Sequence, residues 1–201
     1  MARALLVAFV YDSWADLDRV VEGLDRGLAE QQPNGGSAIA WSVGHVTNQL
    51  DGWVNSRFGG IAPHGLIGSK HFRDGGGADD WPAIQQGVGE VRQLARSFLD
   101  HLSDADLRRT IPYDGSLLEL RARGLNLSYA LLRIAAHHYV HTGEIAATLG
   151  SRGRRVPSLP GRLPEVLAAI QPSGRSASGS RRSSRTPRSS GRRGSPSDEV
   201  E

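Results

Sequence analysis

Apolar residues recur at intervals of three and four positions in four stretches of the chain, which is the spacing of one face of an α-helix. In the first stretch the repeat runs from Leu6 to Leu28 and stops before Pro33, so we expect one long helix there. The repeat resumes after Ser37, the expected N-cap of the second helix, and ends at the glycine pair 59–60.

The second half of the chain contains two more stretches of this kind. The third predicted helix begins at Asp79 or Asp80 and carries the most regular heptad repeat in the chain. The fourth is capped by Asn126 or Ser128 and ends at Gly150. No stretch shows the sustained alternation typical of a β-strand. These patterns predict an all-α protein, a four-helix bundle whose functional side chains point inward.

Length and composition divide the chain into one folded unit and a tail. With 201 residues there is room for a single domain. We assign the bundle to residues 1–152 and a C-terminal extension to residues 153–171. Residues 172–201 have almost no large apolar side chains and are rich in Ser, Arg, Gly and Pro, so we expect a disordered tail. The glycine-rich loop at 61–79 is long enough to cover the mouth of a pocket.

The positive charge of the chain lies in this tail. The sequence has 24 basic and 21 acidic residues, of which seven arginines and three acids lie in residues 172–201. The remaining 171 residues carry 17 basic and 18 acidic groups, a net charge of −1. The bundle is therefore not a basic surface. We expect the tail to be a solvated appendage; weak, salt-sensitive contact with nucleic acid through it is the alternative.

The lack of cysteine and the shortness of the N-terminal apolar run each exclude a class of protein. The chain has no cysteine, which excludes disulfides, thiolate zinc sites and a protein thiol nucleophile. Any thiol chemistry must use a thiol from outside the chain. The N-terminal apolar run "ALLVAFVY" is too short to span a membrane. We expect a cytoplasmic protein without membrane segments.

Histidines on the fourth predicted helix suggest a metal site. His137 and His141 are one turn apart, so both side chains can reach one ion, but the spacing also permits a pair of His138 with His141. A firmly held metal needs a third ligand, and His45 on the second predicted helix is the best candidate. Histidines on such helix faces are also common as hydrogen-bonded interior residues, and spacing alone leaves both interpretations open.

Weaker candidates surround these histidines. Glu144 lies one turn after His141 on the same face, where it can accept a proton or hold a ligand through its second ring nitrogen; it can equally be a surface carboxylate. Gln49 follows His45 by one turn and is a candidate pocket residue. Tyr11 and Asp12 on the first predicted helix are further candidates. We expect Trp41 and Trp53 to be core or interface residues, and their alternative position is in the wall of a pocket.

The segments "SAIAWSVGHVTNQLDGWVN" and "HHYVHTGEIAATLG" together resemble the DinB/YfiT-like superfamily of four-helix-bundle metalloproteins. The hallmark of that family is similar to SIAWxxGH on the second helix and HxxxHxGEI on the fourth, and the likeness covers most of residues 3–150. The resemblance implies a metal triad of His45, His137 and His141 and leaves His138 as a polar neighbour.

The resemblance also implies a function. It suggests a divalent-metal-dependent enzyme, with zinc as the first choice and nickel as the next. In such an enzyme the three-histidine site activates a low-molecular-weight thiol such as bacillithiol or mycothiol, as an S-transferase or isomerase, or activates a water as a hydrolase. From its position one turn after His141, Glu144 is the candidate catalytic carboxylate of such an enzyme, and its substrate would be a small molecule. The resemblance also implies a homodimer. The alternative is a non-catalytic, stress-associated or metal-sequestering helical bundle.

Overall fold

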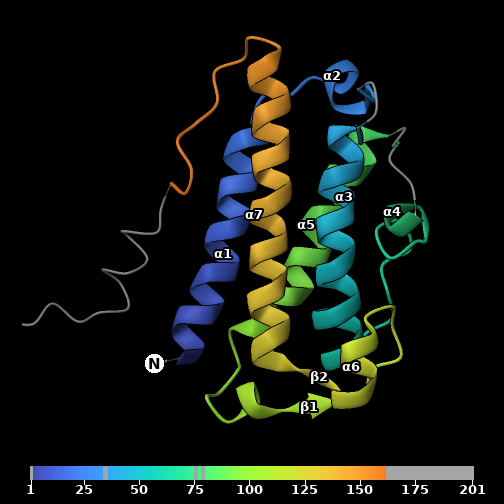
Figure 1. Ribbon diagram of the computed structural model, residues 1–201, viewed down its shortest axis with the longest axis vertical. Coiled ribbons are helices and arrows are strands. Elements are labelled where there is room, and N and C mark those ends of the chain that lie inside the picture. Colours follow the sequence, from blue (N-terminus) through green and yellow to red (C-terminus); the bar gives the residue numbers. More distant parts are fainter. Residues whose placement is uncertain (1, 34–35, 75–76, 78–79, 162–201) are drawn as a thin grey trace, which may run out of the picture.

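The computed structural model describes residues 2–33, 36–74, 77 and 80–161. The predicted tail and the last residues of the predicted extension lie outside this part of the chain. Four long helices run side by side, with α7 between α1 and α3 and with α5 behind them (Figure 1). They are α1 (Ala2–Val21), α3 (Ile39–Leu50) with its π-helical continuation η1 (Asp51–Phe58), α5 (Trp81–Leu99) and α7 (Leu127–Ser151). The predicted all-α four-helix bundle is confirmed.

Short elements connect the long helices. They are α2 (Arg26–Glu30), α4 (His71–Asp74), the 3-10 turn η2 (Asp106–Arg108), α6 (Leu118–Arg123) and the strands β1 (Thr110–Ile111) and β2 (Leu125–Asn126). The two strands pair antiparallel over two residues each. No helix in the described part of the chain is both long enough and apolar enough to cross a membrane.

The prediction of one continuous helix from Leu6 to Leu28 is wrong beyond Val21. The chain leaves α1 at Val21, and Gly23 adopts a left-handed conformation with φ of 63°. Asp25 then caps the separate helix α2 by accepting a hydrogen bond from the Leu28 amide at 2.9 Å. The apolar repeat continues across this break because α2 packs on the same core, so periodicity could not reveal the turn.

The caps of the remaining helices agree with the sequence in two of three cases. Asp80 accepts a hydrogen bond from the amide of Ala83 at the start of α5. Asn126 accepts a hydrogen bond from the amide of Tyr129 at the start of α7. The prediction of Ser37 as a cap is wrong, because Ala38 occupies the N-cap position of α3 and contributes no side-chain hydrogen bond.

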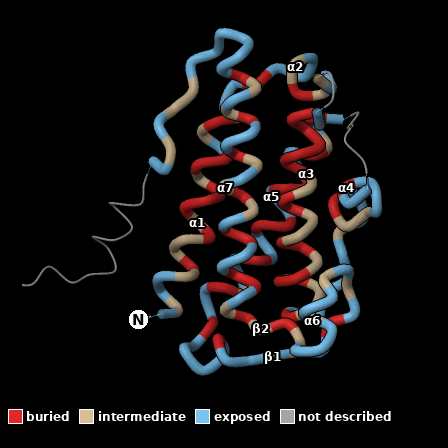
Figure 2. Tube along the Cα trace, viewed as in Figure 1, coloured by how far each residue is buried: buried red, intermediate tan, exposed pale blue. Residues whose placement is uncertain are grey.

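The core lies on the inward faces of the four helices, where buried positions follow each long helix (Figure 2). α1 packs mainly against α7, and α3 packs against both α5 and α7. Trp14, Leu50, Ile84 and Leu131 are among the largest side chains that are fully buried there. Burial of such side chains contributes roughly 1.5–3 kcal/mol each relative to exposure. Because α3 and α7 are in direct contact, residues on their facing sides meet inside the bundle.

Residues 61–74, the described first part of the loop predicted at 61–79, pack on α3. They contain α4, and the side chains of Ile67 and Phe72 are buried. Asn48 of α3 donates to the carbonyl of Ile67 at 2.6 Å, and Trp41 donates its indole N–H to the carbonyl of His71 at 2.9 Å. Polar side chains of α3 therefore satisfy backbone carbonyls of the loop and hold it in place.

Gly44 allows this loop to approach α3. A Cβ atom at this position would overlap the ring of Phe72, so only glycine leaves room for the buried aromatic side chain. The backbone of α3 and the ring of Phe72 thus pack in direct contact beside His45.

We predict that Gly44→Ala destabilises the protein by roughly 1–3 kcal/mol, because the added methyl group overpacks the contact with Phe72. The matched control is Gly89→Ala in α5, where a Cβ would meet no atom within 4 Å. The control should be stabilised by up to about 1 kcal/mol through helix propensity. Urea denaturation of both variants measures the difference, and equal stability would refute the role assigned to Gly44.

Candidate metal centre

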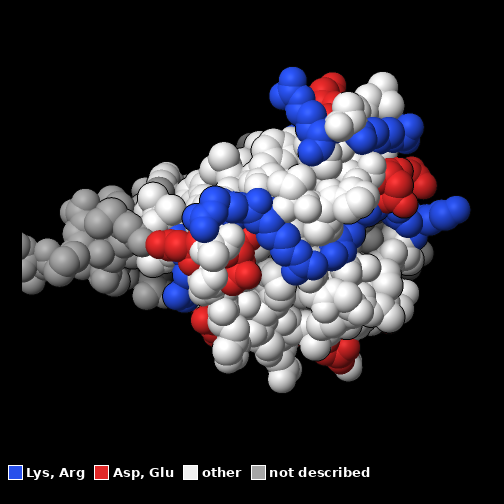
Figure 3. Space-filling view, turned by 90° about the horizontal axis from the view of Figure 1, so that it is seen from below, with Lys and Arg blue, Asp and Glu red and all other residues white. Residues whose placement is uncertain are grey.

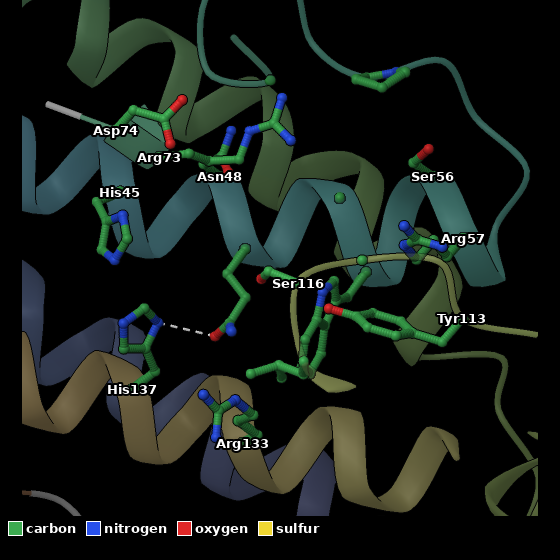
Figure 4. A pocket seen from close by; sticks show the side chains of 17 residues that line it. His45, Asn48, Ser56, Arg57, Arg73, Asp74, Tyr113, Ser116, Arg133 and His137 are labelled. Atoms are coloured by element: carbon green, nitrogen blue, oxygen red, sulfur yellow. Dashed lines mark hydrogen bonds between the residues drawn. The ribbon is translucent and has the colours of Figure 1, made fainter. Parts of the chain in front are cut away.

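Three histidines from two helices converge between α3 and α7. His45 comes from α3, and His137 and His141 come from α7. One ring nitrogen of each lies within 4.8 Å of the other two. The Nε2 atoms of His137 and His141 are 3.0 Å apart. All three side chains are half-buried, and His45 and His137 face each other at one end of a cavity (Figure 4).

His138 is turned away from this group. Its side chain is completely buried in the core, and its Nδ1 atom bonds to the carbonyl of Ile134 at 2.8 Å. Successive residues on a helix point about 100° apart, so His137 and His138 cannot serve the same site. The alternative pairing of His138 with His141 is therefore wrong, and the i,i+4 pair is the one that converges.

The ring of His45 is held from two sides. Its Nδ1 atom lies 2.6 Å from the carbonyl oxygen of Phe72, so Nδ1 carries the hydrogen and Nε2 carries the lone pair. The indole of Trp41 stacks on the same ring at a centroid distance of 4.5 Å and an angle of 13°. The docked loop and one turn of α3 together fix the orientation of this imidazole.

The two rings on α7 are held in the same manner by side chains. Nδ1 of His137 bonds to Oε1 of Gln49 at 2.9 Å, across the space between α7 and α3. Nδ1 of His141 bonds to Oε2 of Glu144 at 2.7 Å, within α7. Each neutral imidazole has one N–H, and an oxygen acceptor places that hydrogen on Nδ1. The lone pairs of both rings are therefore on Nε2.

This arrangement is unfavourable without a cation. The Nε2 atoms of His137 and His141 face each other at 3.0 Å, and two lone pairs cannot form a hydrogen bond with each other. Burial, together with the neighbouring His141 and His45, lowers the pKa of His137 to about 3, which disfavours a proton between the rings. Burial also lowers the pKa of His45. Neutral imidazoles with converging lone pairs are the form in which histidine binds metal.

The spacing of the nitrogens fits a small divalent ion. Zinc binds histidine nitrogen at 2.0–2.1 Å, so two nitrogens at a tetrahedral angle lie about 3.3 Å apart. The distance of 3.0 Å between the Nε2 atoms of His137 and His141 is close to this value, and a ring nitrogen of His45 lies within 4.8 Å of both rings' ligand atoms. An oxygen acceptor on the second nitrogen of each ligand is also characteristic of metal-binding histidines. The group is compatible with a divalent metal.

A cavity of about 760 Å³ adjoins the histidines. α3 and η1 form one wall through Gln49 and Trp53, and the docked loop and α7 form others (Figure 4). Ligand sites commonly have volumes of roughly 300–1,000 Å³. π-Helical turns such as η1 occur frequently at functional sites. The prediction that the loop borders a pocket agrees with this arrangement.

Several predicted pocket residues lie elsewhere. The hydroxyl of Tyr11 donates to Asp100 at 2.6 Å, and Asp12 accepts a hydrogen bond from Tyr139. Neither Tyr11 nor Asp12 lines the cavity, because α1 packs on the other side of α7. Gln49 and Trp53 do line it. The carbonyl of Phe72, which orients His45, had no recognisable signal in the sequence because any residue supplies a backbone carbonyl.

Comparison with known families agrees with this geometry. The family model of the DinB superfamily matches residues 10–145 of the chain. The chain belongs to the DinB superfamily. The match runs from Val10 within α1 to Ile145 within α7 and includes all three histidines of the cluster. No curated protein gives a significant match to the chain.

We predict that the metal-free protein loses stability as the pH falls below about 6.5. The pKa of the buried His138 is lowered to about 3 by burial and by the charge of Arg92, whereas an unfolded histidine titrates near 6.5. The unfolded state therefore binds a proton that the folded state excludes. This stability is complete above pH 6.5 and is lost toward pH 3, at about 1.4 kcal/mol per pH unit.

Urea denaturation of chelator-treated protein between pH 7 and pH 5 measures this slope. His138→Leu should reduce the slope by about 1.4 kcal/mol per pH unit, the share of one histidine, because His137, whose pKa is also lowered to about 3, still contributes. Substitution of the exposed His101 by Gln is the control and should leave the slope unchanged. A wild-type stability that is constant over this range would contradict the buried neutral state of His138.

Proposed function

We propose that His45, His137 and His141 bind one divalent metal ion and that this DinB protein is a metal-dependent enzyme acting on a small molecule in the adjoining cavity. The observation that carries the proposal is the set of Nδ1 contacts, which direct three Nε2 lone pairs toward one point. Zinc is the first candidate and nickel the second, because both suit imidazole ligands.

The bound ion would supply a Lewis acid that ionises a thiol or a water at neutral pH, since three neutral imidazoles leave its charge uncompensated. With no cysteine in the chain, a thiol must come from a second substrate of low molecular weight. S-transfer or isomerisation with such a thiol is our leading proposal, and hydrolysis by water is the second.

The residues of the chain hold the ligands and shape the site. Gln49, Glu144 and the carbonyl of Phe72 each fix one imidazole, while Trp41 covers one face of His45. The Glu144 carboxylate contacts Nδ1 of His141, on the side of the ring opposite Nε2. This contact supports a positioning role for Glu144 over the proton-accepting role.

The open cavity favours an enzyme over the alternative of a non-catalytic, metal-sequestering bundle. A storage site needs no space beside the ion, whereas a catalytic site needs an open position for a substrate. His45 and His137 both line the cavity, so a small molecule in it would lie beside the ion.

We also propose that the protein forms a homodimer through the outer face of α7. Six uncharged residues recur on this exposed face at steps of three and four: Tyr129, Leu132, Ala136, Val140, Gly143 and Ala147. The side chains of Leu132 and Val140 are 51% and 56% exposed. A continuous apolar stripe of this kind is typical of a surface that is covered in the assembled protein.

We predict that His45→Ala, His137→Ala and His141→Ala each abolish retention of zinc or nickel after dialysis. Glu144→Ala should weaken metal affinity by roughly 10–100-fold, because it removes the acceptor that orients His141. Elemental analysis by plasma mass spectrometry measures the retained metal. His101→Ala is the matched control, since His101 lies outside the cluster. Equal metal content in all five variants would eliminate the proposed site.

We predict metal-dependent conjugation of a small thiol with an aryl halide. The thiol sulfur forms a C–S bond, halide leaves, and the thiol proton is released to solvent. A spectrophotometric screen with several thiols should show turnover that His137→Ala abolishes. If the metal-loaded protein turns over neither thiol conjugation nor ester hydrolysis, the non-catalytic alternative replaces the enzyme.

We predict that Leu132→Glu combined with Val140→Glu converts a dimer to a monomer, because two charges would be buried without partners in the interface. Sedimentation velocity measures the mass. Leu118→Glu is the control, since Leu118 is 68% exposed but lies on α6, outside the stripe. A wild-type monomer, or a double variant that remains dimeric, would argue against this interface.

A further inference from the structure

The cavity beside the histidines is lined by three arginines and one carboxylate. The arginines are Arg57, Arg73 and Arg133, and the carboxylate belongs to Asp74. The guanidinium of Arg57 is already bound, because it lies 2.5 Å from a carboxylate oxygen of Asp114 and over the ring of Tyr113. The other two arginines therefore decide which charge a ligand must carry.

Arg73 and Arg133 have free guanidinium groups. Within the described residues, neither side chain forms an ion pair or a hydrogen bond. Arg73 comes from α4 in the docked loop, and Arg133 comes from α7, one turn before His137. They lie on opposite walls of the cavity (Figure 4). The Asp74 carboxylate beside Arg73 offsets one of these two charges, so Arg73, Arg133 and Asp74 together leave a net positive charge in the cavity, which attracts an anion.

The remaining lining favours a hydrogen-bonding ligand. Asn48, Gln49, Ser56, Tyr113 and Ser116 add neutral polar side chains to the same cavity. The loop before α6 lines one end of the cavity, and the end of the bundle that carries α6 and the two strands bears both basic and acidic side chains (Figure 3). The attraction for an anion therefore comes from the arginines of the cavity itself, since residues 1–171 carry a net charge of −1.

We infer that the cavity is a binding site for a small organic anion, with Arg133 holding a carboxylate or phosphate group beside the three-histidine centre and Arg73 attracting the anion from the opposite wall. A guanidinium presents a planar fork of donors that matches the two oxygens of either group. Arg133 is one helical turn from His137, so an anionic group on Arg133 places the rest of a small ligand next to the histidines. The inference rests on the proposed function, because that function supplies the reaction of the bound anion. Anion binding itself can be tested separately, since neither arginine is a proposed metal ligand.

Isothermal titration calorimetry of the full-length protein with inorganic phosphate and with succinate tests this site. Each anion is titrated into protein as purified and after chelator treatment. We expect saturable binding of at least one anion in both forms, and the preferred anion identifies phosphate or carboxylate as the recognised group. The Kd should rise about tenfold or more in Arg133→Gln, which loses a charge-assisted hydrogen bond, and should also rise in Arg73→Gln, which loses a positive charge.

Two further variants separate the cavity from general charge effects. Arg154→Gln removes an exposed arginine beyond the end of α7 and should bind as the wild type does. Gly52→Leu introduces a side chain into open space in the cavity wall, where a Cβ meets no atom within 4 Å, and should weaken binding by occupying the site.

Three results would overturn the inference. The first is that neither anion binds saturably. The second is that Arg133→Gln and Arg73→Gln both bind with wild-type affinity. The third is that binding disappears after chelation, which would mean that the anion binds only to the metal. Failure of the metal proposal gives a different pattern: all forms lack metal, yet anion binding persists and still depends on Arg133.

Discussion

The site depends on one electrostatic constraint, the meeting of imidazole lone pairs that cannot bond to one another. Oxygen acceptors on each Nδ1 atom leave the Nε2 atoms of His137 and His141 facing each other at 3.0 Å, with His45 directed to the same place. Burial opposes protonation of His137. A bound cation would relieve this arrangement, because it would accept the lone pairs that face one another.

The bundle supplies this constraint through contacts between elements that are distant in sequence. Gln49 on α3 orients His137 on α7, so correct packing of the two helices is required for the site. The loop around α4 orients His45 through Phe72, and Gly44 allows that loop to reach α3. The same loop contributes Arg73 to the cavity. Stability of the loop, orientation of the ligand and shape of the cavity are therefore coupled.

Helix periodicity and capping residues were sufficient to predict the bundle, because the four long helices bury one continuous apolar face each. They could not predict the turn at Gly23, since Val21 before it and Leu24 after it pack against the same core. Spacing permitted His137 and His141 as a pair but equally His138 and His141, and it made His45 a candidate third ligand. The resemblance to a family chose His137, and the structure brings His45, His137 and His141 together. The contributions of Phe72 and Arg73 depend on the tertiary docking of a loop that has no periodic pattern.

Anomalous diffraction from a crystal of metal-loaded protein, recorded above and below the zinc and nickel absorption edges, tests the central claim most directly. The account predicts one anomalous peak within bonding distance of Nε2 of His45, His137 and His141, about 2.0–2.1 Å for zinc, with one coordination position open to the cavity. A peak at another place, or a ring of His45 turned away from the other two, would contradict it.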